Sequence, residues 1–437
     1  MLSQIQRRFQ DRKFIYRYFL ILRYVVSLIT SVIIVRSGLP KEDIGTYEWI
    51  LFFVHSGTFF FHHGLTTYLM ASYEKQDIDD KSKFVSGIYT LGMVFASFVG
   101  ILLLGIVIFS PNWLLFKSLH SFIYYILGYI FVMSALAPLE IVYFVLDKSK
   151  HFLKYIHFSQ IGLLILFFTV ALMGPSIEHF LMVLIGFGVI RWVYFMLSFS
   201  NTSFFTADYR YIFTVFIGSL PILGNQMISM IMEVMDGWMV KYFFSDATFA
   251  VFRYGARELP LSNFLFAGLS MAYISILQTN GFDLLELKQK VNKLMYFTFP
   301  IAIILMLSSP FIFGFVYTDT FRESAIIFNV YLLILISRVL LPQTILLAKQ
   351  QFNIIMYSTI IEIIANITLS LWWVKIWGLK GLVFATVIAY LIQKVVLIMY
   401  NTRVNHIKIQ DMIHLKHYIL LSFGLILTFY FSYHFVL

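Results

Sequence analysis

The chain contains no cysteine among its 437 residues. It can therefore form no disulfide, no thiolate nucleophile and no cysteine-ligated metal site, and it carries no sign of the redox state of its compartment. Charged residues are also scarce, at 12% compared with about 25% in soluble domains. This scarcity argues against three soluble domains, which the length alone would allow.

Enzyme signatures are missing as well. We expect no DxD-type metal site, and the sequence has no Walker loop and no nucleophile elbow. No loop is long enough to form a domain that could hold a soluble substrate. The adjacent His62 and His63 point to different faces of a helix, which favours packing or hydrogen bonding over a metal site. We expect no enzyme, no metal site and no cofactor.

Apolar residues dominate what is present. They make up 60% of the chain, and runs of about 20 residues, the length that crosses a bilayer as a helix, recur from end to end. The sequence thus predicts an all-α polytopic membrane protein. We expect thirteen spans, at 14–35, 44–72, 84–109, 118–146, 152–173, 179–199, 209–240, 247–278, 291–316, 324–346, 353–374, 379–400 and 416–436.

The distribution of Lys and Arg between the loops predicts the orientation. With the N-terminus inside, inner segments carry fourteen of these residues and outer segments carry four. A basic start at Arg7, Arg8, Arg12 and Lys13 belongs to the inner set. We therefore expect a cytoplasmic N-terminus, no cleaved signal peptide and, from the odd span count, an external C-terminus. The net charge of +10 is explained by these loops, and no nucleic-acid partner is expected.

A weak internal repeat divides the chain. VRSGLPKEDIGTY at 35–47 aligns without gaps on VKYFFSDATFAVF at 240–252. Six spans separate the copies, so both run in the same direction. We expect two six-helix bundles, 1–205 and 206–402, related by a parallel pseudo-twofold repeat, with an extra C-terminal helix at 403–437.

The most informative stretch is 245–260, which places charges inside an apolar run. Arg253 and Arg257 lie four residues apart and so share one helix face. Each charge is costly inside a membrane, and two guanidiniums on one face suit the two-pronged binding of a diphosphate. A structural alternative is neutralisation by Glu258 or by an acid on a neighbouring helix. We favour the anion site, because charge within a membrane is by default functional.

Glu233 and Asp236 lie three residues apart, on one face near the outer end of their span. Three interpretations stay open. These acids form a salt bridge to Arg253 that breaks when phosphate arrives, or they couple transport to H⁺ or Na⁺. In the third, they are interfacial acids in contact with water, beside the boundary anchors Trp238 and Lys241.

Four further charges lie deep within predicted spans. From their depths we expect two structural ion pairs, Arg338 with Glu362 and Glu140 with Arg191. Pro260, just beyond the arginine pair, is the expected hinge.

Over nearly its whole length the chain resembles the bacterial polysaccharide (O-antigen) flippases of the multidrug/oligosaccharidyl-lipid/polysaccharide exporter superfamily. The similarity lies in the length, the basic start, the span pattern and the residues that begin spans two and eight. These are Asp43-Ile44-Gly45-Thr46-Tyr47, Thr248-Phe249-Ala250-Val251-Phe252 and the run from Phe252 to Glu258. The second copy has Ala250 and Phe252 where the pattern has Gly and Tyr. Thirteen spans also differ from the twelve or fourteen usual in the family.

The resemblance implies a flippase that moves an undecaprenyl-diphosphate-linked oligosaccharide from the inner to the outer leaflet of the bacterial inner membrane. Arg17, Arg23, Arg253 and Arg257 would then supply cavity charge, and Tyr47 and Tyr254 would stack on sugars. A polysaccharide polymerase and a chain-length regulator are the expected partners. The alternatives are a cation-coupled drug exporter, which should have an acidic cavity, and a membrane-embedded polymerase or ligase, which should have a long outer loop.

Overall fold

The structure is a computed structural model that describes residues 12–77, 80–109, 115–146, 148–199, 209–256, 260–279 and 284–436. Within these ranges the secondary structure is helical and contains no β-strand. The predicted all-α fold is thereby confirmed. Arg7, Arg8 and Arg257 lie outside the described residues.

The helices form two compact units, which are described separately. The first consists of Met1–Met235 and Ser245–Ala247, and the second of Asp236–Phe244 and Thr248–Leu437. The predicted boundary at 205/206 and the separate final segment from 403 stay predictions.

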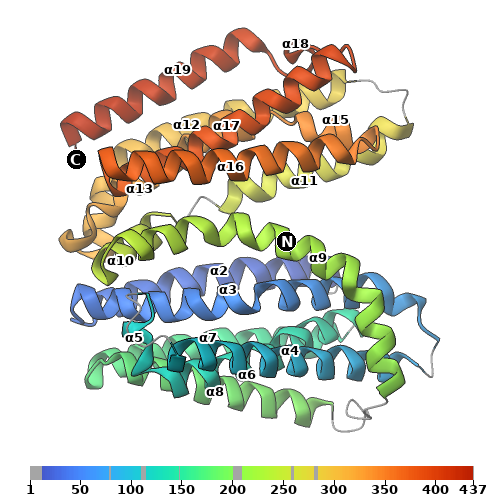
Figure 1. Ribbon diagram of the computed structural model, residues 1–437, viewed down its shortest axis with the longest axis vertical. Helices are drawn as coiled ribbons and strands as arrows, with labels where there is room; N and C mark the ends of the chain where they lie inside the picture. Colours follow the sequence, from blue (N-terminus) through green and yellow to red (C-terminus); the bar gives the residue numbers. More distant parts are fainter. Residues whose placement is uncertain are drawn as a thin grey trace, which may run out of the picture. The chain divides into compact units, whose positions relative to one another are not determined.

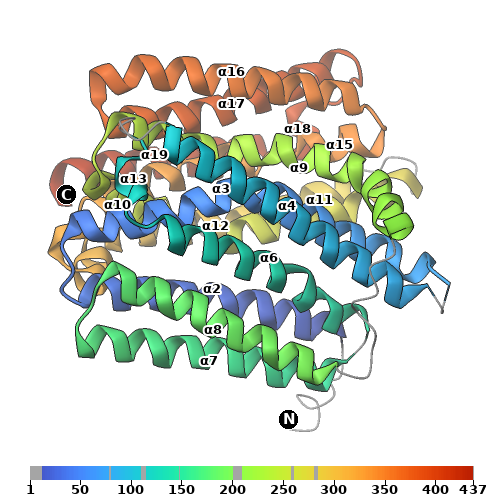
Figure 2. The same ribbon diagram turned by 60° about the horizontal axis from the view of Figure 1, so that its bottom comes forward.

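Among its described residues, the first unit contains seven long helices and two short ones (Figure 1, blue to green). They are α2 (Arg12–Arg36), α3 (Lys41–Ser72), η1 (Tyr73–Lys75), α4 (Lys81–Phe109), α5 (Lys117–His120), α6 (Ile123–Val145), α7 (Ser149–Met173), α8 (Ile177–Ser198) and most of α9 (Tyr209–Phe243). Figure 2 shows α7 and α8 running side by side next to α2. Helix α6 packs against α3, α4 and α8 and so forms the centre of the unit.

The second unit continues from α10 to the end of the described chain (Figure 1, green to red). Its elements are α10 (Asp246–Gly255), α11 (Pro260–Thr279), α12 (Leu285–Tyr317), η2 (Asp319–Phe321), α13 (Ser324–Leu332), α14 (Ile334–Arg338), α15 (Pro342–Ala348), α16 (Phe352–Trp377), α17 (Leu379–Arg403), α18 (Ile409–Met412), α19 (Leu415–Phe431) and the π-helical η3 (Ser432–Val436). Helices α16 and α17 form its tightest pair. At Gly381 a Cβ atom would lie 2.3 Å from the carbonyl oxygen of Trp373, so only glycine allows this approach.

Large apolar side chains cover the outside of these helices. Ile101, Leu172 and Phe315 are each more than 70% exposed, at 71%, 72% and 79%. Water would disfavour so much exposed apolar surface, whereas lipid tails match it. Ten described helices are long and apolar enough to cross a membrane, or eleven if the 46° bend between α13–α14 and α15 lies within one span. The chain is therefore a multi-pass membrane protein.

Two of the predicted spans are not among these ten helices, for physical reasons. Helix α3 is 32 residues long but is not among the ten apolar helices, because polar side chains such as His55, His62, His63 and Thr66 interrupt its apolar sequence. The predicted span 247–278 is two helices, α10 and α11, rather than one. Pro260, the predicted hinge, begins α11, where its missing N–H costs no hydrogen bond.

Candidate functional site

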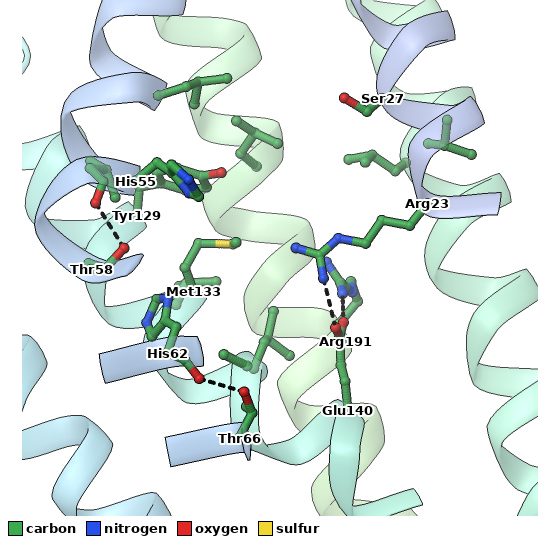
Figure 3. Close-up of a pocket in the computed structure, with 18 of the residues that line it drawn as sticks. Arg23, Ser27, His55, Thr58, His62, Thr66, Tyr129, Met133, Glu140 and Arg191 are labelled. Atoms are coloured by element: carbon green, nitrogen blue, oxygen red, sulfur yellow. Dashed lines mark hydrogen bonds and ion pairs between the residues drawn. The ribbon is translucent and has the colours of Figure 1, made fainter. Parts of the chain in front are cut away.

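A cavity of about 420 Å³ lies among the helices of the first unit. Its lining comes from α2, α3, α6, α7 and α8, which bring together residues far apart in the sequence. Two opposing walls can be distinguished in Figure 3, one carrying arginines and one carrying histidines and threonines.

The arginine wall is built around one carboxylate. Glu140 of α6 accepts a short hydrogen bond from Arg191 of α8, and its other oxygen lies 3.6 Å from a guanidinium nitrogen of Arg23 of α2. The hydroxyl of Tyr155 on α7 donates to Glu140 over 3.0 Å. Four helices thus converge on this carboxylate, and Figure 3 shows the two guanidiniums approaching it from different helices.

The charges of this wall do not balance. Arg23 and Arg191 are the only Lys or Arg among the described lining residues, and Glu140 is the only Asp or Glu. Two positive charges and one negative charge leave a net charge of +1 when the histidines are neutral. Because the surroundings are apolar and of low dielectric, this excess charge attracts an anion more strongly than it would in water.

The facing wall belongs to α3. His55, Thr58, His62 and Thr66 recur at three- to four-residue intervals and so lie along one side of the helix. His62 Nε2 lies 2.9 Å from Ser134 Oγ, and His55 Nε2 lies 3.5 Å from a carboxylate oxygen of Glu233. This wall offers imidazole and hydroxyl groups that can form hydrogen bonds.

Only some of the predicted binding residues line this cavity. Arg23 and Tyr47 line the cavity, whereas Arg17 is exposed on α2 and is not among the lining residues. Tyr254 is 1% exposed in the second unit, where its ring stacks on Tyr317 with centroids 5.1 Å apart. Arg253 also belongs to the second unit, on α10. Their roles in binding stay predictions.

Asp236 is buried in the second unit, at 8% exposure, within a network of polar side chains. It accepts hydrogen bonds from Thr386 over 2.7 Å, Tyr331 over 2.9 Å and Asn366 over 3.3 Å. Asn366 in turn accepts from Ser370 over 2.9 Å. Glu233, by contrast, has a side chain that is 53% exposed beside His55 in the first unit.

Of the two predicted ion pairs, the structure brings together Glu140 and Arg191. Glu362 is 3% exposed, and its Oε2 has no hydrogen-bond partner among the described residues. Lys394 interacts electrostatically both with Glu362 and with Arg338. The pairing of Arg338 with Glu362 stays a prediction.

Sequence reasoning missed Lys394, Tyr155 and the donors around Asp236. Lys394 had the same signal as the other charges, a basic residue inside an apolar span, and could have been found by it. Tyr155, Tyr331 and Thr386 had no such signal, because single hydroxyl residues are common in membrane helices. Over the described residues, no group of three or more His, Cys, Asp or Glu side chains is arranged to hold a metal ion.

Comparison with known proteins identifies the fold. No protein-family model and no curated protein matches the chain. Among solved structures, the lipid II flippase MurJ in an inward closed conformation matches with a TM-score of 0.69 and 17% identity, over 95% of this chain and 92% of that one.

An inward-facing multidrug resistance MATE family transporter of the MOP superfamily matches with a TM-score of 0.61 and 12% identity, over 86% of this chain and 92% of that one. A MOP superfamily transporter from Pyrococcus furiosus, described as having a binding pocket of reverse polarity, gives 0.59 and 10%, over 90% and 93%. The chain therefore has the fold of MOP superfamily transporters, with the two-bundle repeat that its sequence predicted.

Proposed function

We propose that this protein is a flippase for a polyprenyl-diphosphate-linked oligosaccharide. It moves the undecaprenyl-diphosphate-linked glycan from the inner to the outer leaflet of the bacterial cytoplasmic membrane by alternating access, for surface polysaccharide assembly. The observation that carries the proposal is the excess positive charge of the cavity, where Arg23 and Arg191 share the single carboxylate of Glu140. Arginine binds phosphate through two parallel donors, which suits a diphosphate.

The remaining features of the cavity fit the rest of such a substrate. The side chains of His55, Thr58 and Thr66 supply donors and acceptors for sugar hydroxyls on the wall facing the arginines. In this proposal Arg253 and Arg257 form a second phosphate contact, as their spacing predicts. A polysaccharide polymerase and a chain-length regulator would act on the product in the outer leaflet.

A drug exporter is the main alternative, since MATE transporters share the fold. A cationic drug needs an unpaired acid in the cavity, yet Glu140 lies against two arginines. A polymerase or ligase is less well supported, because the structures that the chain resembles are those of transporters and a flippase.

The deciding experiment measures translocation in vesicles containing the purified protein. A fluorescent polyprenyl-diphosphate oligosaccharide should become protected from a membrane-impermeant reductant, and protein-free vesicles should show no such protection. Ethidium, a lipophilic cation, should not be transported. Ethidium transport with a stationary lipid-linked sugar would instead establish the drug exporter.

We further propose that transport is coupled to Na⁺ through Asp236. Two hydroxyl oxygens lie next to the carboxylate, Thr386 Oγ1 and Tyr331 Oη, and the amide nitrogen of Asn366 donates to its other oxygen. Oxygen ligands are those that hard cations prefer. Proton coupling through Glu233 and His55 is the alternative, since both lie together near the cavity wall.

The cytoplasmic location of the N-terminus can be tested with single cysteines, because the chain has no cysteine background. Glu42 and Asp77 are both exposed. Glu42 lies in the first turn of α3 and Asp77 follows its other end, and the 32 residues of this helix separate its ends by about 48 Å. We expect Glu42→Cys to react with an impermeant maleimide in intact cells, and Asp77→Cys to react only after permeabilisation. The opposite pattern would place the N-terminus outside.

A further inference from the structure

The geometry of Glu140 suggests more than a structural ion pair. Its carboxylate lies between the two arginines of the cavity and presents one oxygen to each, as a phosphate group would. It is the only acid among the described lining residues, so no neighbouring acid shares this role. A side chain of the protein itself thus occupies the position between the two arginines where an anion would bind.

The two contacts of this carboxylate are unequal. Toward Arg191 the pair is buried, with side chains 8% and 15% exposed, and Tyr155 donates to the same oxygen over 3.0 Å. Toward Arg23 the separation is 3.6 Å and the Arg23 side chain is 54% exposed. Exposed pairs contribute little, whereas breaking a buried pair is strongly unfavourable. Arg23 can therefore exchange its partner, while Arg191 keeps Glu140 in place.

We propose that Glu140 is an internal competitor for Arg23 and sets the charge that a ligand must carry to enter the site. This inference rests on the proposed function, in which the cavity takes a diphosphate. A diphosphate carries about two negative charges and several acceptor oxygens. Its exchange for the single carboxylate at Arg23 therefore lowers the free energy of the complex. A phosphodiester brings one charge, and its exchange for a carboxylate gains little.

The consequence is that the site discriminates against the phospholipids of the surrounding membrane. Phosphodiester headgroups of ordinary phospholipids are in large excess over any lipid-linked sugar in a bilayer. A cavity with two unopposed arginines would bind them as well. Glu140 weakens the binding of every anion at Arg23, but only ligands that carry a single charge are excluded by it. Selectivity of this kind comes from a built-in repulsive element rather than from added attraction.

Two soluble probes test the inference directly on the purified full-length protein. Inorganic pyrophosphate represents the diphosphate, and dimethyl phosphate represents the phosphodiester. By calorimetry we expect the wild type to bind pyrophosphate and to bind dimethyl phosphate at least about tenfold more weakly. Glu140→Gln removes the competing charge and should tighten dimethyl phosphate binding about tenfold, a larger factor than for pyrophosphate. Glu178→Gln, on α8 and outside the cavity lining, is the matched control and should change neither affinity.

A second variant covers the case in which Glu140→Gln does not fold. Glu140→Asp keeps a negative charge beside Arg191 but withdraws the other oxygen from Arg23, so a smaller change in the same direction is expected. Arg23→Gln combined with either Glu140 variant should erase the gain, because the competition takes place at Arg23. Loss of folded protein in both Glu140 variants would show a purely structural role and would refute the inference.

The outcomes separate this inference from the proposed function. Suppose that Arg23→Gln weakens pyrophosphate binding while both Glu140 variants leave the ratio of the two affinities unchanged. The internal competitor would then be refuted and the anion cavity would stand. If Arg23→Gln also leaves pyrophosphate binding unchanged, the phosphate site in this cavity fails, and the proposed function loses its main support.

Discussion

Arg23→Glu is expected to abolish translocation of the lipid-linked oligosaccharide while the protein still reaches the membrane. The substitution changes the net charge of the cavity lining from +1 to −1 and places two carboxylates where Glu140 and Arg23 now lie 3.6 Å apart. The Arg23 side chain is 54% exposed, so solvent screens its contacts, and a single such pair is worth about 1 kcal/mol. Replacing attraction by repulsion for a doubly charged diphosphate is therefore expected to weaken binding at least about tenfold.

The measurement is protection of the fluorescent polyprenyl-diphosphate sugar in vesicles, with the amount of reconstituted protein determined in the same samples. Arg36→Glu is the matched control, since Arg36 is exposed at the far end of the same helix and outside the cavity lining. Arg23→Lys should keep part of the activity, because lysine keeps the charge but loses the two-pronged geometry. Full activity of Arg23→Glu would mean that the diphosphate does not bind in this cavity.

Most of the fold could be predicted from the sequence, because the bilayer imposes a single rule on every span. Each crossing needs about 20 apolar residues as a helix, and that signal is local in the chain. The rule explains why helix positions such as α4, α7 and α16 were predicted to within a few residues. It did not predict the division of 247–278 into two helices, since apolar composition alone does not show where a helix is interrupted.

The candidate site could be predicted only as separate charges and one ion pair, not as a cluster of three charged side chains. Arg23, Glu140 and Arg191 each stood out, because an ionised group inside an apolar span is costly and is rarely there without a role. Their convergence depends on how α2, α6 and α8 rotate and pack, which the sequence spacing does not contain. Depth along a helix suggested the pairing of Glu140 with Arg191, but it could not add Arg23 as a third partner.

Sequence spacing also does not show which side chains meet in the second unit. Depth alone suggested Arg338 as the partner of Glu362, and it gave no indication that Lys394, on a third helix, also interacts electrostatically with that carboxylate. Likewise, the spacing of Glu233 and Asp236 suggested one shared environment. In the structure one is exposed beside His55 and the other is buried among three donors. The path of α9 through both units separates them.

Because Glu233 and Asp236 lie in different surroundings, substituting each one separately tests which ion is coupled to transport. Asp236→Asn is expected to abolish stabilisation of the purified protein by Na⁺ and sodium-dependent translocation in vesicles. The substitution removes the negative charge and turns one carboxylate oxygen into an amide donor, which faces the donors of Thr386 and Tyr331. Both changes oppose a cation held by oxygen atoms.

Thermal unfolding measures the first effect. A ligand that binds only the folded state contributes about 2.7 kcal/mol at a hundredfold excess over its Kd, which for a chain of this length raises the Tm by about 3 °C. The wild type should show this rise in NaCl relative to choline chloride of equal ionic strength, and Asp236→Asn should not. Glu233→Gln, three residues before the second unit begins at Asp236 on the same helix, should keep the full sodium response.

A contrary result is equally informative, because Asp236 would couple transport to Na⁺ and Glu233 would couple it to protons. If Asp236→Asn keeps the sodium response, the oxygen atoms around Asp236 form a structural network rather than a cation site. If Glu233→Gln instead removes the dependence of translocation on a pH gradient, the exposed pair of Glu233 and His55 carries the coupling proton. Transport driven by Na⁺ in the wild type and in Glu233→Gln, but not in Asp236→Asn, is the pattern that establishes Asp236 as the coupling residue.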